Sequence, residues 1–305
     1  MKAIRHFGIV VEDLEKSLHF YQDLLGLKIF RTIIKPFLNK GIGGRFPFLR
    51  NLFYRQFSRL VVRFLSPITI PGGYKLYLPQ NGIDYLTEAY EEFATELIRK
   101  NLKQGDTFLD IGGGIGYYSV IVSKIVGEQG KVIVFEPDPN YFKLLQKNVK
   151  ENGCNNVTLF QKAVSDRNGK TNLYLYDKVG RNRIEKVNYF LTGKFEVHDR
   201  IEVESIKLDD LLRDEKIDFI KMDIEGSQYL ALQGMRTLIE RNPRVTMITE
   251  VPDYRNLEFL RLLEKLGFRI YVMDEDTKKL NLIDNLEECA GMINKGEVHD
   301  LFCKK

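Results

Sequence analysis

The chain has 305 residues, of which 44% are apolar and 29% are charged, a composition typical of a globular protein with a sizeable core. Three widely spaced cysteines and four histidines without metal-binding spacing argue against a zinc ribbon, a disulfide framework and a histidine-rich metal enzyme. The formal net charge of +4 does not by itself indicate a nucleic-acid partner.

The N-terminus predicts a small β-α-β fragment over residues 1–34. Residues 3–11 have the apolar pattern of a buried strand, 13–25 that of a helix, and 27–34 that of a second strand. The fragment is too short to bury both of its faces alone. Its edge strand is therefore a candidate surface for docking or for a homodimer.

A basic segment follows at residues 35–66. No acidic residue occurs between Asp23 and Asp84, and arginines recur every four residues at Arg55, Arg59 and Arg63. This spacing, with apolar residues between the arginines, is typical of a basic amphipathic helix. Three interpretations stay open: contact with an anionic membrane surface, packing of the apolar face with the arginines in solvent, or a clamp of arginines on an acidic or phosphorylated acceptor. Residues 68–82 then predict a β-hairpin that turns at a pair of glycines.

From residue 85 onward, helices and strands alternate, which predicts an α/β fold with a mostly parallel sheet covered on both faces. A polar stretch over 165–206, with a hairpin-like run at 171–177, interrupts the alternation. The predicted helices are 85–102, 115–126, 140–153, 229–240 and 255–267, and the predicted strands are 107–111, 131–136, 157–164, 217–223, 244–251 and an antiparallel pair at 268–274 and 278–284.

The strongest motif is the glycine-rich run of residues 110–116, Asp-Ile-Gly-Gly-Gly-Ile-Gly, between a strand and a helix. Glycines allow a tight turn and the close approach of a ligand, and the following helix offers free N–H groups. A dinucleotide-binding motif requires glycine at its sixth position, counted from its first glycine. That position is Tyr117 when the motif starts at Gly112 and Ser119 when it starts at Gly114. The acid at Asp110 disfavours a phosphate and suits a ligand with an amino group or a sulfonium.

A second acid, Glu136, follows the next strand, 20 residues after Gly116. A carboxylate at this edge of a sheet can accept hydrogen bonds from both hydroxyls of a ribose. An acid, a glycine loop and a second acid in this order describe a site for S-adenosylmethionine. The alternative is a glycine turn beside a solvated glutamate.

Residues 76–285 resemble the FkbM family of S-adenosylmethionine-dependent methyltransferases. The resemblance implies a Rossmann-like class I methyltransferase fold, with a seven-stranded, mostly parallel sheet and an antiparallel last strand. It also implies S-adenosylmethionine as cofactor and O-methylation of a hydroxyl. The matching segments are 105–119, 131–153, 155–166, 205–212, 217–235 and 246–251.

The family pattern also implies roles for single residues. It assigns Asp110, Gly112, Gly114 and Gly116 to the methionine moiety, Glu136 and Pro137 to the ribose, and Ala163 and Val164 to the adenine. Asp223 would lie beside the methyl group. Gln228 stands where the family often has glutamate, which puts any acidic role at this position in doubt.

Methyl transfer to a hydroxyl is an in-line displacement that also requires removal of the hydroxyl proton. The candidate catalytic residues are Asp223 and Glu225, in a predicted strand-to-helix turn, and Glu250, at the end of the next strand. Asp223 could instead bind the cofactor, Glu225 could stabilise the helix dipole, and His198 is a further candidate base. We assign no metal site, and an ion bridged by Asp223 and Glu225 stays an alternative.

Residues 4–30 resemble the opening of a vicinal oxygen chelate, glyoxalase-like, domain. In that family the first histidine binds a metal, so the resemblance would give this role to His6. The similarity stops after about 30 residues, and a single histidine does not make a metal site. We therefore interpret this segment as a structural addition.

These observations predict an N-terminal extension over 1–75 and a methyltransferase domain over 76–305. The predicted function is O-methylation of a hydroxyl of a glycan or small metabolite, with no specific nucleic-acid partner. The alternative is a non-catalytic scaffold with a degenerate methyltransferase fold, which the basic segment tethers to anionic lipid or RNA. The first 17 residues lack an apolar signal-peptide stretch, which predicts a cytoplasmic location, with peripheral attachment to an anionic membrane left open.

Overall fold

The structure, a computed structural model, describes residues 62, 66–80, 82, 91–176, 184, 197–251 and 255–305. The chain divides into two compact units, Met1–Tyr90 and Glu91–Lys305. The sequence places the domain boundary after residue 75, and that assignment stays a prediction. The predicted β-α-β fragment lies outside the described residues, as does the basic segment apart from Val62 and Ser66.

The first unit contains a short antiparallel hairpin of β1 (Ile68–Ile70) and β2 (Tyr74–Leu76). Gly72 and Gly73 form the turn with φ angles of 100° and 79°, a region that glycine enters without a steric penalty. The hairpin predicted at this glycine pair is thus confirmed.

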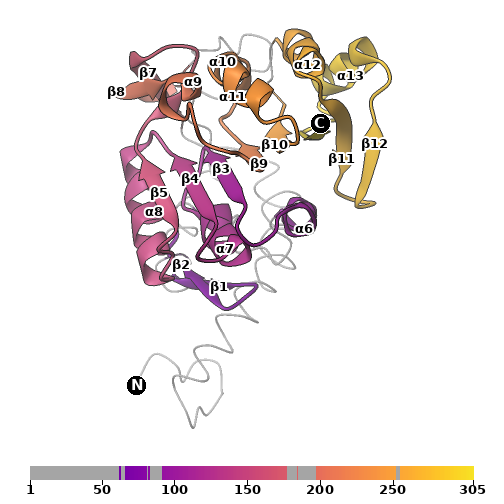
Figure 1. Cartoon of the computed structure of the whole chain (residues 1–305). Helices are drawn as coiled ribbons and strands as arrows, with labels where there is room; N and C mark the ends of the chain where they lie inside the picture. Colours follow the sequence, from indigo (N-terminus) through magenta and orange to yellow (C-terminus); the bar gives the residue numbers. More distant parts are fainter. Residues whose placement is uncertain are drawn as a thin grey trace, which may run out of the picture. The chain divides into compact units, whose positions relative to one another are not determined.

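The second unit is built on an eight-stranded sheet with the order β12-β11-β13-β10-β9-β3-β4-β5 (Figure 1). The strands are β3 (Thr107–Ile111), β4 (Lys131–Phe135), β5 (Val157–Phe160), β9 (Phe219–Met222), β10 (Thr246–Glu250), β11 (Arg269–Asp274), β12 (Lys279–Leu282) and β13 (Asp300–Lys304). The five strands from β5 to β10 are parallel, and β13, the last strand of the chain, is antiparallel to both of its neighbours. The predicted mostly parallel sheet is confirmed, including the antiparallel hairpin of β11 and β12. The eighth strand is β13, which inserts between β10 and β11 and which the prediction lacked.

The second unit also contains the helices of the described residues from Glu91 onward. They are α6 (Glu92–Asn101), α7 (Tyr117–Val126), α8 (Pro139–Glu151), α9 (Leu208–Leu211), α10 (Gln228–Gln233), α11 (Arg236–Arg241), α12 (Asn256–Lys265) and α13 (Leu286–Asn294). The chain runs from β3 outward to β5, then returns to β9 and proceeds to the other edge. Right-handed crossovers therefore put α7 and α8 on one face and α10 to α12 on the other. Ligands of such sheets bind at the carboxyl ends of the strands where the order reverses, which here are β3 and β9.

The two strands at this reversal are buried at every residue. Strands covered on both faces are continuous apolar runs, and each run here is interrupted by a charged side chain. Asp110 and Lys221 are the interruptions, and they lie opposite each other in the β3–β9 register. Because a buried charge is costly without a partner, these two residues mark a polar site inside the core.

The prediction of one strand over 157–164 was wrong. The chain leaves the large sheet after β5, and β6 (Ala163–Val164) pairs in parallel with β8 (Val197–Ile206) in a separate three-stranded sheet, which β7 (Gly169–Tyr176) completes. The polar pair Gln161-Lys162 separates the two strands, and Lys162 forms an ion pair with Glu204 of β8. The polar pair therefore marks the point at which the chain changes sheets.

The single helix predicted over 229–240 was also wrong, because the structure has α10 and α11 in its place. A Cβ atom at Gly234 would lie 1.9 Å from the carbonyl oxygen of Ser165. The helix is interrupted where the loop that follows β6 touches its backbone. No part of the prediction contained α13 or β13, although Asn285 accepts a hydrogen bond from the Glu288 amide in a capping arrangement that the sequence displays.

Candidate functional site

The loop between β3 and α7 is held against β4 by its backbone. The amides of Gly112 and Gly113 both donate to the carbonyl oxygen of Phe135, at 2.8 and 3.0 Å. Gly112 has a φ of 85°, and a Cβ atom there would lie 1.9 Å from the carbonyl oxygen of Asp223. Only glycine fits at this position, because the loop after β3 and the loop after β9 approach each other at backbone distance.

The other two predicted glycines also have left-handed backbones, with φ angles of 54° at Gly114 and 88° at Gly116. Gly116 is the residue before α7, and a Cβ atom there would lie 2.7 Å from a side-chain carbon of Leu145. The loop therefore offers a ligand a surface made of backbone.

Glu136 follows β4 and is 7% exposed. Its two carboxylate oxygens accept hydrogen bonds from the amides of Gly114 and Asp138, both at 2.8 Å. Burial raises the pKa of Glu136 to about 8, although the two amide hydrogen bonds oppose this. The carboxyl group is thus fixed toward the glycine loop, and Pro137 links it to Asp138, which caps α8 by accepting from the Asn140 amide at 2.7 Å.

Asp110 is a buried residue of β3 and precedes the glycine loop in the sequence. The Ser119 hydroxyl in the first turn of α7 donates to its Oδ2 atom at 2.6 Å. Burial raises the pKa of Asp110 to about 6, while the Ser119 hydrogen bond and the Lys221 ammonium lower it. This carboxyl group therefore ties the start of α7 to the strand and places a titratable acid below the loop.

Ala163 and Val164 form β6, and both are 3% exposed. The Ala163 side chain packs with Leu173 and Val203, and the Val164 side chain belongs to the main core. Any contact of these residues with adenine would therefore come from their backbone, and their predicted role stays a prediction.

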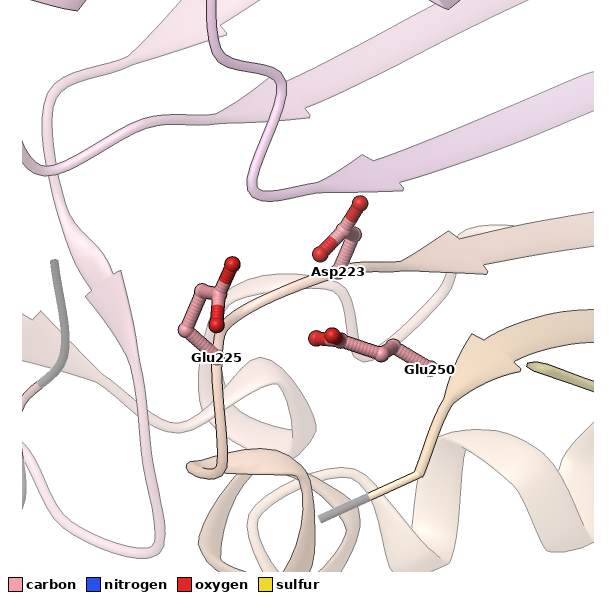
Figure 2. A group of neighbouring side chains, drawn as sticks. All are labelled: Asp223, Glu225 and Glu250. Carbon is pink, nitrogen blue, oxygen red and sulfur yellow. The ribbon is translucent and has the colours of Figure 1, made fainter. Parts of the chain in front are cut away.

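The three predicted catalytic acids lie together (Figure 2). Asp223 follows β9, Glu225 lies in the turn before α10, and Glu250 ends β10. One carboxylate oxygen of each lies within 4.8 Å of the others, and Figure 2 shows the three side chains around a common space. We call these three residues the acid cluster.

Lys221 adjoins the acid cluster and was not among the predicted residues. Its Nζ atom lies 3.3 Å from Asp223 Oδ2 and 3.8 Å from Glu91 Oε2, and 5.5 Å from the centre of the Tyr118 ring. The Tyr118 hydroxyl donates to Glu91. Burial alone would lower the pKa of Lys221, but the carboxylates of Asp223 and Glu91 raise it above its ordinary value. The lysine is therefore charged and holds Asp223 in place.

Glu250 and Asp300 are opposite each other in the β10–β13 register. Burial, followed by the carboxylates of Asp223 and Glu225, raises the pKa of Glu250 well above its usual range. Burial also raises the pKa of Asp300 to about 7, against the effect of Lys221. Asp300 was missed because β13 was not predicted, whereas an isolated lysine in a buried strand was a signal that could have identified Lys221.

His198 lies in β8, and its role as a base stays a prediction. His6 lies outside the described residues. In the part of the chain that the structure describes, no helix combines the length and the apolar character needed to cross a bilayer.

A family model described as the methyltransferase FkbM domain matches residues 110–270. A second model, described as bleomycin resistance protein-like N-terminal, matches residues 4–35. Both matches confirm the resemblances found in the sequence, the second one over a segment outside the described residues.

Curated relatives share shorter segments with this chain. A protein-L-isoaspartate O-methyltransferase of Methanococcus maripaludis is 46% identical over 57 residues, which are 19% of this chain and 27% of that protein. The protein of the same name from Ignicoccus hospitalis is 29% identical over 110 residues, 36% of this chain and 47% of that protein. The chain thus spans less than half the length of these relatives.

Among solved structures, a precorrin-6y C5,15-methyltransferase from Geobacter metallireducens is similar to this chain. The two share 16% sequence identity with a TM-score of 0.40, and the match covers 70% of this chain and 87% of that one.

Proposed function

This chain belongs to the FkbM methyltransferase family, and we propose that it transfers a methyl group from S-adenosylmethionine to a hydroxyl group of a glycan or another small metabolite. One observation carries the proposal: the glycine-rich loop at the strand reversal, whose Gly114 amide donates to the buried carboxyl group of Glu136. This pairing supports a nucleoside cofactor that lies across the carboxyl ends of β3 and β4.

On the cofactor side, Glu136 accepts hydrogen bonds from the ribose hydroxyls. The left-handed glycines let the methionine moiety approach the loop backbone, and Asp110 supplies negative charge beneath its amino group. Pro137 would border the ribose, and the backbone of Ala163 and Val164 would flank the adenine. S-adenosylmethionine is positively charged at its sulfonium, which suits a site that is rich in carboxyl groups.

On the acceptor side, the acid cluster favours a neutral hydroxyl over an anionic acceptor. Isoaspartate, named in the relatives, is methylated on a carboxylate, and three carboxyl groups within 4.8 Å would repel such a group while no cation is bound between them. A hydroxyl instead gains from a nearby carboxylate, because it must lose a proton when its oxygen is methylated.

In the proposed reaction, the acceptor oxygen attacks the methyl carbon in line with the carbon–sulfur bond. That bond breaks with its electron pair going to sulfur, so the cofactor leaves as S-adenosylhomocysteine, and the hydroxyl proton passes to Asp223. Within the acid cluster, Asp223 follows the strand that pairs with β3, and its own carbonyl oxygen approaches Gly112 of the loop. Lys221 acts as a positioning residue that orients the Asp223 carboxylate.

Transfer of a labelled methyl group from S-adenosylmethionine tests the proposal. The acceptor panel contains soluble glycans, lipid-linked glycans, small hydroxylated metabolites and an isoaspartyl peptide. We expect label in a hydroxylated acceptor as a base-stable methyl ether. Label as a base-labile ester in the peptide would instead support carboxylate methylation and contradict the proposed acceptor.

The alternative function, a scaffold that the basic segment tethers to anionic lipid or RNA, predicts a different outcome. A scaffold with a degenerate site binds neither S-adenosylmethionine nor S-adenosylhomocysteine and labels no acceptor. The intact glycine loop and the buried Glu136 favour the enzyme over the scaffold.

A further inference from the structure

We propose that the acid cluster of Asp223, Glu225 and Glu250, together with the side-chain oxygen of Gln228, binds a divalent metal ion. The binding of the ion is independent of the proposed methyl transfer, and only its role in catalysis rests on the proposed function. The proposal rests on the spacing of the oxygens, on an unpartnered buried amide and on the charge of the surroundings.

The spacing of the carboxylate oxygens matches a single ion. One oxygen from each acid lies within 4.8 Å of the other two. Oxygen ligands lie about 2.3–2.6 Å from Ca²⁺ and about 2.0–2.1 Å from Mg²⁺, so oxygens on opposite sides of one ion are up to about 5.2 Å or about 4.2 Å apart. The cluster therefore fits Ca²⁺ as it stands, and a small contraction would fit Mg²⁺.

Gln228 supplies the independent observation. Its side chain is fully buried, its Nε2 atom donates to Glu250 Oε2 at 3.3 Å, and its Oε1 atom has no hydrogen-bond partner. A buried carbonyl oxygen without a partner is costly. The amide head thus reaches the acid cluster and carries an oxygen that needs a positive partner.

The charges around the acid cluster also favour a bound cation. Lys221 supplies one positive charge and shares it between Asp223 and Glu91. Six carboxyl groups interact in this neighbourhood, those of the acid cluster, Glu91, Asp110 and Asp300. A divalent ion bound by the acid cluster would offset the repulsion between carboxylates that the single charge of Lys221 does not neutralise.

The donor set selects the kind of ion. Carboxylate and amide oxygens are hard ligands that suit Mg²⁺, Mn²⁺ and Ca²⁺, whereas zinc sites use nitrogen and sulfur ligands as well. An acceptor hydroxyl that joined the ion as a further ligand would lose its proton more readily. The site would therefore bind the acceptor and activate it in the same place.

Metal binding is measured directly by calorimetry and by the electron paramagnetic resonance of Mn²⁺, with chelator-stripped full-length protein. We expect one Mn²⁺ per chain, displaced by Mg²⁺ or Ca²⁺. Changing Glu250 to Gln should weaken Mn²⁺ binding by at least about tenfold, the scale at which loss of a supporting group lowers metal affinity. The matched control, Glu297→Gln on an exposed glutamate, should bind Mn²⁺ like the wild type.

Gln228→Glu provides a second test of the metal site if the Glu250→Gln variant folds poorly. A fourth carboxylate in the place of the amide should raise the affinity for Mn²⁺, an outcome that misfolding cannot imitate. Weaker or unchanged Mn²⁺ binding in this folded variant would contradict the assignment of Gln228 as a ligand.

The proposal fails if wild-type protein binds no Mn²⁺ at millimolar concentration while it still binds S-adenosylmethionine. That result would leave the proposed function in place. Failure to bind S-adenosylmethionine, with normal Mn²⁺ binding, would instead contradict the proposed function and leave the metal site standing.

Discussion

At the scale of single residues, the site divides between groups that hold a cofactor and groups that face an acceptor. Glu136 and the glycine loop lie at the ends of β3 and β4, and the acid cluster lies at the ends of β9 and β10. Gly112 joins the two halves, because its missing side chain lets the loop approach the carbonyl oxygen of Asp223. Substitutions on each side should therefore affect different steps.

Asp223→Asn should lower turnover far more than it lowers the affinity for S-adenosylmethionine. Asparagine has nearly the same shape but does not accept a proton at neutral pH, so we expect a loss of about 10²–10⁴-fold, typical of removing a general base. Steady-state kinetics and cofactor titration of the same preparation separate the two effects. Normal turnover with weakened cofactor binding would instead identify Asp223 as a cofactor ligand.

The raised pKa of Glu136 predicts a pH-dependent stability. The pKa is about 8 in the folded chain against an ordinary 4.5, so the folded state binds this proton more tightly. The contribution of this bound proton to the free energy of unfolding is complete below the ordinary pKa. It is lost as the pH rises through about 8, at up to about 1.4 kcal/mol per pH unit.

Urea unfolding at several pH values measures this contribution. We expect the free energy of unfolding of the wild type to fall between about pH 5 and 9 relative to that of Glu136→Gln, which does not titrate. Parallel pH profiles of the two proteins would show that Glu136 keeps an ordinary pKa.

At the scale of elements, most of the fold could be predicted from the sequence. Buried parallel strands such as β3 are continuous apolar runs, and α8 displays both its amphipathic face and the capping Asp138. The switch from β5 to β6 and the break at Gly234 could not be predicted, because each depends on contacts between segments far apart in the chain.

The site was predictable to a similar degree. The acids that follow strands were found from their positions, because parallel strands bring their carboxyl ends to one edge of the sheet. Glu91 and Asp300 were not, since only the packing of α6 and β13 brings them to Lys221.

Gly234→Ala tests the contact that separates α10 from α11. An added Cβ atom would meet the Ser165 carbonyl oxygen, so we expect destabilisation of about 1–3 kcal/mol, the usual cost of overpacking. Gly291→Ala is the matched control, because a Cβ atom at that helical glycine meets nothing within 4 Å. Denaturant unfolding compares them, and equal stability of the two variants would show that the contact is not rigid.

At the scale of the whole molecule, the uneven charge leaves attachment to anionic membranes and packing of the basic segment as alternatives, which vesicle binding separates. Ten basic residues and no acids lie between Asp23 and Asp84, and each basic residue near an anionic surface contributes about 1 kcal/mol. Binding to anionic vesicles should weaken with salt and with the change of Arg55, Arg59 and Arg63 to serine. Equal sedimentation with neutral and anionic vesicles would support packing of this segment instead.

The central claim is that the glycine loop and Glu136 form a site for S-adenosylmethionine. Calorimetric titration of the full chain with S-adenosylmethionine and S-adenosylhomocysteine tests it most directly, with Glu136→Ala as the site variant and the exposed Glu151→Ala as the control. We predict that both ligands bind the wild type and the control with one site per chain, and that Glu136→Ala weakens binding by about 1–3 kcal/mol, the cost of unpaired hydrogen-bonding groups. Absence of binding to the folded wild type, or equal affinity in the folded Glu136→Ala variant, would contradict the account.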